Sequence, residues 1–399
     1  MASPGKILIV GGGIGGLALA LALIRRGIEA EVHEQASELR EVGAGVQLGA
    51  NGTRVLHALG LKAALEQTQV LASGKQARLW NTGQCWTTFD LGAIAQQRYG
   101  APHIFMHRGD LHAALADAIR AEAPDAIRLG RRFTGLLQDD AGVTVTFDDG
   151  ARATATLAVG ADGIRSAVRA ALFGRDAPEF VGIVAWRGLV PMQELPPQIA
   201  RTAAVNWLGP NGHALHYPVR RGEVMNIVAF AERSDWQVES WTERGTSDEL
   251  ANDFRGWHTD LHDILTRIAE PFKWALMMRP PMPRWSVGRV TLLGDACHPT
   301  LPFLGQGAVM AIEDAYVLAA CIAAHPRDHA AAFAAYEGER RARTMAVVER
   351  SLATRRNAVN AAFAAADSTA AHIEREWRRE RVTERYDWIY RYDATAATS

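Results

Sequence analysis

Residues 6–34 read KILIVGGGIGGLALALALIRRGIEAEVHE, and this stretch decides the fold. Residues 7–10 are a short apolar run without polar alternation, which predicts a strand buried on both faces of a parallel sheet. Residues 17–24 continue as a helix that Gly27 ends, and residues 31–34 form the next strand. The stretch therefore predicts the opening strand, helix and strand of an α/β fold.

The glycines between the first strand and the helix follow the spacing G-x-G-x-x-G at Gly11, Gly13 and Gly16. The first allows a tight turn, the second lets the backbone approach a pyrophosphate, and the third lets the helix pack against the strand. Phosphates would bind unpaired N–H groups at the helix start, and Glu34 stands where a carboxylate accepts bonds from ribose hydroxyls. The stretch predicts dinucleotide binding.

Residues 7–24 carry no charge, so a signal peptide or a membrane span is the alternative interpretation. Five glycines between positions 11 and 16 argue against both, because each weakens a helix by about 1 kcal/mol relative to alanine. Cys85, Cys297 and Cys321 are odd in number and far apart, which gives no disulfide framework. We expect a soluble cytoplasmic protein that makes no membrane contact.

The chain has 399 residues, a length that favours about two domains. Its net charge of −1 gives no reason to expect a nucleic-acid partner. There are 11 tryptophans, and several could line an aromatic pocket, although core packing is the ordinary use of each. We expect no metal site, and either a monomer or a homodimer.

A glycine-punctuated loop follows the dinucleotide motif over residues 39–51, with Gly43, Gly45 and Gly49. Glycines leave such a backbone mobile or open to close approach by something flat, and a plain surface loop is the alternative. A helix is predicted after it, from about residue 52 to residue 59.

The next segments alternate strand and turn signals. Residues 75–90 predict a hairpin, and a helix begins near Asp110, which we expect to be its N-cap. Residues 126–160 predict strands joined by Asp- and Gly-containing turns, and they end in Asp162 and Gly163 before another helix.

Strands without intervening helices fill residues 180–231, which predicts an antiparallel sheet and a second domain. The first pattern then returns, since residues 289–295 predict a buried strand ending in Gly294 and Asp295, followed by a helix near Gly305. The cofactor domain is therefore expected to combine segments from both halves of the chain. The predicted parts are cofactor domain at 1–74, 101–178 and 276–345, substrate-domain hairpin at 75–100, antiparallel substrate domain at 179–275, and helical region at 346–399.

Three motifs follow one another along the chain: the glycine motif with Glu34, the pair Asp162–Gly163, and the pair Gly294–Asp295 with the helix after it. In this order they resemble the single-component, FAD-dependent aromatic hydroxylases, the para-hydroxybenzoate hydroxylase family. The resemblance covers nearly the whole chain and implies a Rossmann-like FAD-binding domain with an inserted antiparallel substrate domain. In that family the first motif holds the ADP half of FAD, the Asp-Gly pair serves FAD and NAD(P)H, and the aspartate of the later Gly-Asp pair holds the ribityl chain. The implied cofactor residues are Gly11, Gly13, Gly15, Gly16, Glu34, Gln35, Val46, Gln47, Arg108, Asp162, Gly163, Asp295, Pro302, Gly305, Gly307 and Ala308.

The predicted helix start at residues 305–308 suits this cofactor on physical grounds. Reduced flavin carries negative charge at its N1–C2=O edge, and a helix N-terminus offers N–H donors and a favourable dipole there. The resemblance implies that NADH or NADPH reduces the flavin, that O₂ adds to give a C4a-hydroperoxide, and that the distal oxygen attacks an electron-rich aromatic ring. The flavin supplies this chemistry, and the protein positions the ring and excludes water.

Electrophilic attack is faster on a deprotonated phenol, so a base is expected, and we assign this role to His213 with an ordinary pKa near 6.5. The spacing to Tyr217 resembles the His and Tyr pair of hydroxybenzoate and hydroxynicotinate hydroxylases. Residues four apart on a strand share a face, so both could reach one ring. The alternatives are that His213 lies in a turn, or that His216 is the base. His298 is expected to be structural.

Trp186 and Phe303 are the residues that we expect to pack against the substrate ring, and Arg187 is a candidate partner for a carboxylate, with a scaffold salt bridge as the alternative. The loop at residues 301–307 resembles that of salicylate hydroxylases. The expected reaction is therefore oxidative decarboxylation of salicylate to catechol. Hydroxylation of 3-hydroxybenzoate or 6-hydroxynicotinate is the alternative, and a non-catalytic dinucleotide-binding protein is the alternative of another class.

Overall fold

The computed structural model describes residues 4–39, 44–199, 202–233, 243–358, 363 and 366–396. Gly43, one of the three glycines of the predicted loop, lies outside these residues.

A five-stranded parallel sheet forms the centre of the cofactor domain, in the order β18-β12-β1-β2-β8. All four residues of β1 are buried, as the apolar run predicted. The chain enters this sheet early through β1 and β2 and returns to it much later through β18. The strands are β1 (Ile7–Val10), β2 (Ala30–His33), β8 (Ile127–Arg128), β12 (Leu157–Gly160) and β18 (Val290–Leu292).

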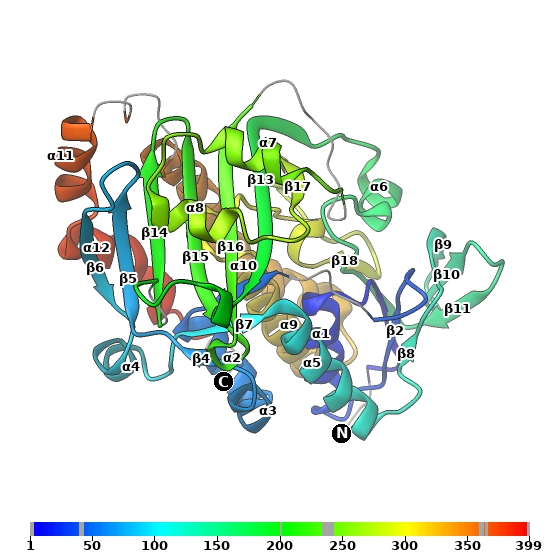
Figure 1. Cartoon of the computed structure of the whole chain (residues 1–399). Helices are drawn as coiled ribbons and strands as arrows, with labels where there is room; N and C mark the ends of the chain where they lie inside the picture. The colour runs from blue at the N-terminus through cyan, green and yellow to red at the C-terminus, as the bar shows by residue number, and fades with distance from the viewer. Residues whose placement is uncertain are drawn as a thin grey trace.

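The helix α1 (Ile14–Ile24) packs against α5 (Arg108–Glu122) and α9 (Gly307–Ala324) (Figure 1). Among the described helices, α9 alone is long and apolar enough to cross a membrane, but most of it is buried inside the protein. It also contacts α2 (Ala50–Ala58) and α10 (His329–Ala358). We conclude that α9 is a core helix.

The helix α5 begins differently from the prediction. The N-cap is His107, whose ring Nδ1 accepts a hydrogen bond from the backbone N–H of Gly109 at 3.2 Å. Asp110 lies in the first turn of the helix, where its negative charge still favours the helix dipole. The Asp110 N-cap prediction is therefore wrong by one turn.

A seven-stranded sheet forms the second layer, in the order β17-β13-β16-β15-β14-β5-β6. Its pairs are antiparallel, as predicted, except that β14 and β5 run parallel. The predicted hairpin supplies β5 and β6, which join this sheet from the early part of the chain. The strands are β5 (Gly74–Leu79), β6 (Cys85–Asp90), β13 (Glu179–Pro191), β14 (Ala203–Gly209), β15 (Gly212–Val219), β16 (Val224–Glu232) and β17 (Phe272–Met278).

The two faces of this sheet have different neighbours. One face packs its apolar side chains against α7 (Ser247–Asp253) and α8 (Thr259–Leu265), which lie in front of the sheet in Figure 1. We call it the outer face. The other face carries clusters that include residues of α9, α10 and α12 (Arg379–Arg391), and we call it the inner face.

Smaller elements complete the fold. Two three-stranded sheets contain β3 (Gly45–Leu48), β7 (Ile104–His107) and β4 (Val70–Leu71), and β11 (Arg152–Ala155), β10 (Val143–Phe147) and β9 (Phe133–Gln138). The remaining α-helices are α3 (Lys62–Glu66), α4 (Ala93–Tyr99), α6 (Ala167–Phe173) and α11 (Ala366–Glu376). The short 3₁₀ helices are η1 (Met192–Glu194), η2 (Arg220–Gly222), η3 (Gly294–Ala296) and η4 (Pro302–Leu304).

Candidate active site

The glycine loop between β1 and α1 has the geometry that its spacing predicted. Gly11 has φ +111°, and a Cβ on Gly16 would collide with the carbonyl oxygen of Gly11. Within the described part of the chain, a Cβ on Gly13 would meet nothing within 4 Å, so this backbone is open at the start of α1. A pyrophosphate fits that space, because the first N–H groups of a helix have no partner within the helix.

Gly15 plays a different part from the other glycines of the loop. A Cβ there would lie 2.7 Å from the side chain of Leu293 and 3.0 Å from that of Ala311 on α9. The missing side chain therefore lets α1 approach α9 closely, and the structure gives Gly15 a packing role beside the implied cofactor contact.

Glu34 lies at the end of β2 beside this loop. Its carboxylate accepts hydrogen bonds from the backbone N–H of Gly12 at 2.7 Å and from that of Ala36 at 2.9 Å. A carboxylate can accept about four bonds, so capacity remains for ribose hydroxyls. His112 holds the loop from the other side, with Nε2 2.6 Å from the carbonyl oxygen of Gly12. The neighbouring Gln35 is exposed.

Asp162 holds the start of α6. Its carboxylate accepts hydrogen bonds from the Ser166 hydroxyl at 2.5 Å, from Ala167 N at 2.7 Å and from Val168 N at 3.1 Å. Burial raises the pKa of Asp162, and these hydrogen bonds oppose the rise. Gly163 has φ +77°, and a Cβ there would meet none of the described residues within 4 Å. The pair thus leaves a backbone position open beside a fixed carboxylate.

Asp295 and Arg108 come from distant parts of the chain and act on each other. Asp295 lies in η3, where desolvation by the surrounding protein raises the pKa of its carboxyl and the positive charges of His298 and Arg108 oppose the rise. Arg108 is the first residue of α5. The resemblance placed both residues along the cofactor, and the fold brings them close enough for their charges to interact.

The loop before α9 presents open backbone. Pro302 and Gly305 are exposed, and among the residues that the structure describes nothing lies within 4 Å of a Cβ on Gly305. α9 starts at Gly307, and its N-cap residue, Gln306, makes no side-chain cap, so the N–H groups at Gly307 and Ala308 remain available to an anion or a flavin edge.

A buried network of charges supports this loop from below. Glu313, which is 0% exposed, contacts Arg340 at 2.7 Å and Arg343 at 2.8 Å. Asn51 of α2 donates to Glu313 at 2.7 Å and to Gln306 at 3.0 Å. The network therefore ties the N-cap of α9 to helices from both halves of the chain. Sequence reasoning missed it, because nothing in a lone helical Glu marks its burial.

His298 lies in a buried ion pair, which is the position that a structural residue would take. Its Nε2 lies 2.5 Å from Asp314, and both side chains are buried. Burial disfavours the charged ring, but the neighbouring Cys297 and Asp314 outweigh burial and hold the pKa of His298 well above its ordinary value. The residue therefore belongs to the ionic network beneath the loop.

His213 and Tyr217 both lie on β15 and both point to the inner face. The His213 ring stacks on Phe230 at 5.6 Å and lies 6.5 Å from Phe303 of η4. The Tyr217 ring lies 5.0 Å from Phe105 of β7. His213 therefore lies beside η4, and Tyr217 lies beside β7. The position of His213 within β15 excludes the alternative that it lies in a turn.

The strand β3 also lies against Tyr217. A Cβ on Gly45 would lie 2.7 Å from the side chains of Tyr217 and Asn226, and Asn226 accepts a hydrogen bond from Gly45 N at 2.6 Å. Val46 and Gln47 follow on this strand and are partly buried. Leu215 stands between His213 and Tyr217 on the same face of β15.

His216 points the other way. It pairs with Val205 and Ile227, which belong to the cluster on the outer face. Burial, together with the positive charge of Arg78, lowers the pKa of His216 to about 3. The structure therefore separates the two histidines that the sequence left open, and only His213 faces the cofactor domain.

The expected pKa of His213 needs correction. The side chain is 5% exposed, and burial lowers its pKa from 6.5 to about 4. The ring is therefore neutral at physiological pH and can accept a hydrogen bond or a proton from a neighbouring group, but its charge state does not change near pH 6.5 in the protein without substrate.

The prediction that Trp186 packs against a substrate ring is not supported by its position. In the register of β13 and β16, Trp186 pairs with Ala229 on the outer face, whereas Ala185 pairs with Phe230 on the inner face. The Trp186 indole donates to Asp253 at 2.7 Å, beneath α7. Phe303, by contrast, lies in the inner-face cluster with Phe230.

Arg187 is on the inner face and 2% exposed. Its guanidinium lies over the rings of Phe272 at 5.5 Å and Trp274 at 5.3 Å, both on β17. The side chain therefore leans toward the edge of the sheet and away from β15, which favours a role in the scaffold.

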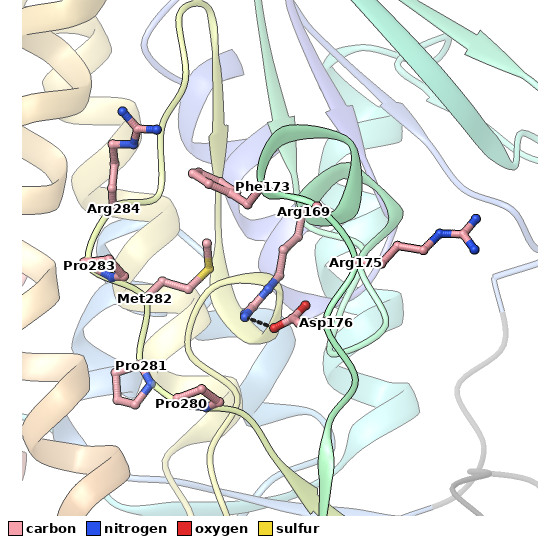
Figure 2. Close-up of a pocket in the computed structure, with 10 residues that line it drawn as sticks. Arg169, Phe173, Arg175, Asp176, Pro280, Pro281, Met282, Pro283 and Arg284 are labelled. Atoms are coloured by element: carbon pink, nitrogen blue, oxygen red, sulfur yellow. Dashed lines mark hydrogen bonds and ion pairs between the residues drawn. The ribbon is translucent and has the colours of Figure 1, made fainter.

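A surface cavity of about 460 Å³ lies elsewhere, between α6 and residues 280–284. Figure 2 shows the ion pair of Arg169 and Asp176 at its centre, with Arg175 extending away. The described residues that line it include none of the predicted site residues.

The loops at Gly13, Gly163 and Gly305, together with Glu34, Arg108 and Asp295, fit FAD. Open backbone occurs at Gly13, Gly163 and Gly305, two of them beside helix starts, and each is a place where a flat or phosphorylated group can approach. Glu34 stands at the ribose position of the motif, and Arg108 and Asp295 lie close enough for their charges to interact.

Comparison with known proteins agrees with this geometry. The family profile described as "FAD binding domain" matches residues 5–351. The 3-amino-4-hydroxybenzoate 2-monooxygenase PtnB3 of Streptomyces platensis is 40% identical, covering 87% of this chain and 86% of its own. The 6-hydroxynicotinate 3-monooxygenase of Pseudomonas fluorescens is 34% identical, covering 87% of this chain and 90% of its own.

Solved structures give the same result for the fold. A salicylate hydroxylase substrate complex superposes with a TM-score of 0.80 at 26% identity and covers 99% of this chain and 97% of its own. Klebsiella pneumoniae HpxO complexed with FAD and uric acid superposes with a TM-score of 0.80 at 26% identity, covering 98% of this chain and 96% of its own.

Proposed function

The chain belongs to the FAD-dependent aromatic hydroxylases, and we propose that its substrate is a phenolic or aminophenolic aromatic acid bound between β15 and the loop at residues 302–307. FAD, when bound there, would supply the redox chemistry by which one oxygen atom of O₂ enters the ring, with NADH or NADPH as the reductant. The observation that carries the proposal is the position of His213, a neutral buried base on the inner face, in contact range of η4.

Each residue of the space has a physical task. Phe230 and Phe303 supply apolar walls beside His213, and Leu215 lies between the two polar residues of β15. The open N–H groups at the start of α9 favour negative charge on the cofactor edge that meets them. The buried surroundings exclude water, which would otherwise compete for the transferred oxygen.

A base suits this reaction because electrophilic attack requires electron density from a donor group ortho or para to the attacked carbon. In 3-amino-4-hydroxybenzoate, carbon 2 is ortho to the amino group, and in 3-hydroxybenzoate carbon 6 is para to the hydroxyl. We assign His213 to accept the proton of that O–H group, or a hydrogen bond from that N–H group, and Tyr217 to hydrogen bonding at the far side of the ring.

The first substrate that we propose is 3-amino-4-hydroxybenzoate, hydroxylated at carbon 2. The support is the 40% identity over 346 residues to PtnB3, against 26% to the salicylate hydroxylase structure. Salicylate, 3-hydroxybenzoate and 6-hydroxynicotinate follow as second candidates. The salicylate expectation rested on the single loop at residues 301–307, which is a smaller basis.

The test is product identification. The purified flavoprotein is incubated with NADH or NADPH and each of the four acids, and released CO₂ is trapped. The products are separated by chromatography and identified by mass spectrometry. We expect 3-amino-4-hydroxybenzoate to gain one oxygen atom without loss of CO₂. If only salicylate reacts and gives catechol and CO₂, the proposed substrate is wrong. If none of the acids gives an oxygenated product, the proposed function is wrong.

A further inference from the structure

Asn206 of β14 lies on the inner face beside His213. It pairs with Leu215 of β15, the inner-face residue between His213 and Tyr217. Asn206 is 8% exposed and His213 is 5% exposed, so solvent does not compete for their contacts. Sequence reasoning missed Asn206, although a lone amide in the apolar stretch at residues 203–208 is the signal that could have found it.

The orientation of the Asn206 amide follows from its two contacts. One end lies 3.2 Å from the backbone carbonyl oxygen of Gln76, and the other lies 3.2 Å from Nε2 of His213. A carbonyl oxygen only accepts hydrogen bonds, so the end that faces Gln76 must be the donating NH₂ group. The end that faces His213 is then the amide oxygen, which only accepts.

The tautomer of His213 follows from the amide. An accepting oxygen at Nε2 requires the proton of the neutral ring to sit on Nε2, and Nδ1 then carries the lone pair. Nδ1 is buried and has no hydrogen-bond partner within the described part of the chain. The ring is flanked by Phe230 and Phe303, which offer no competing donor.

We propose that Asn206 is a positioning residue that holds His213 as the Nε2–H tautomer, so that the Nδ1 lone pair accepts the proton of a substrate O–H group or a hydrogen bond from a substrate N–H group. The inference rests on the proposed function for its second half only. In the opposite tautomer Nδ1 would present a hydrogen, and it could accept neither a proton nor a hydrogen bond from the substrate.

Two variants separate this role from simple packing. Asn206→Leu keeps a similar volume and removes the acceptor at Nε2. Asn206→Asp keeps an oxygen acceptor at Nε2, removes the donor to Gln76, and adds negative charge that raises the pKa of His213. A merely structural role at the Gln76 contact would damage both variants alike.

The first measurement is the tautomer itself, read from ¹⁵N–¹H correlation spectra of the histidine rings in the labelled flavoprotein, with the His213→Asn variant identifying the His213 signals. We expect Nε2–H in the wild type and in Asn206→Asp at high pH, and loss of that preference in Asn206→Leu. A wild-type ring protonated on Nδ1 would overturn the proposal. This measurement needs no substrate, so it stands even if no acid is hydroxylated.

The second measurement is the yield of hydroxylated product per NADH oxidised, as a function of pH. We expect Asn206→Leu to retain FAD and lose at least about tenfold in product yield. For Asn206→Asp we expect the acid limb to move to higher pH, with yield recovering above it. Wild-type yield in Asn206→Leu, or equal losses in both variants at every pH, would contradict the positioning role.

Discussion

Glu313 and Asn51 lie 2.7 Å apart in the interior, although one belongs to α9 and the other to α2, at opposite ends of the cofactor domain in sequence. Asn51 also bonds Gln306, the N-cap of α9. The open backbone at Gly305 to Ala308 is therefore supported by a buried network with charges of both signs.

Replacing Glu313 tests this network. In Glu313→Ala the buried guanidinium of Arg340 loses one of its carboxylate partners, and removing one member of a buried ion pair costs about 3–5 kcal/mol. We expect this loss in the free energy of unfolding, measured by urea titration of the flavoprotein. Glu66→Ala, which breaks the exposed pair with Lys62, is the control and should cost less than about 1 kcal/mol. Equal effects in the two variants would show that the network contributes no special stability.

Gly13 and Gly16 give a matched pair that separates cofactor binding from folding. A Cβ on Gly13 meets no atom of the described residues within 4 Å, so Gly13→Ala should leave the apoprotein as stable or raise its unfolding free energy by about 0.4–1 kcal/mol. The same methyl group occupies the pyrophosphate space, and we expect FAD to bind at least about tenfold more weakly, by fluorescence titration.

Gly16→Ala should behave in the reverse way, because its Cβ collides with the backbone of Gly11 and overpacking costs about 1–3 kcal/mol. Unweakened FAD binding in Gly13→Ala would remove Gly13 from the pyrophosphate site.

His213 and His216 make the corresponding test for catalysis. His213→Asn should retain FAD and lose about 10²- to 10⁴-fold in hydroxylation rate, because it removes the base. His216→Asn, on the outer face of the same strand, should keep hydroxylation within about threefold of the wild type, as expected of a residue remote from the chemistry. The measurement is product formed per enzyme per second, with bound FAD as the common reference. A larger loss in the His216 variant would reverse our assignment.

The same two histidines set a pH dependence of stability. Unfolded histidine has a pKa near 6.5, whereas burial lowers the folded values to about 4 for His213 and about 3 for His216. The unfolded chain therefore binds more protons between these values, and the stability present above pH 6.5 is lost as pH falls toward 4, at about 1.4 kcal/mol per pH unit for each residue.

Urea titrations between pH 7 and pH 4.5 measure this slope. His216→Gln should reduce the slope by the share of one residue, and an unchanged slope would mean that His216 does not titrate differently on unfolding.

Local patterns sufficed to predict the cofactor domain. The apolar run, the glycine spacing and the terminal acid of residues 6–34 each act over a few residues, and β1, α1 and β2 formed as expected. The Asp110 N-cap failed for a similarly local reason, since a histidine ring nitrogen met the first free N–H one turn earlier.

The substrate face was harder, because strand register is set by pairing between distant segments. Trp186 and Phe303 were equally plausible wall residues in the sequence, but one residue of register places Trp186 on the outer face. The same parity separates His213 from His216. Asn206 escaped notice because its importance depends on a neighbour across the strand pair and not on a motif along the chain.

The closing of one parallel sheet by segments as far apart as β1 and β18 has a consequence for biosynthesis. A nascent chain leaving the ribosome contains the glycine loop of α1 long before residues 294–308 are synthesised. The binding residues for the nucleotide half of the coenzyme are therefore present well before those for its ring system. Stable capture of the vitamin-derived cofactor must therefore wait until α9 has emerged and packed against α1, and truncated translation products that end before α9 should remain colourless.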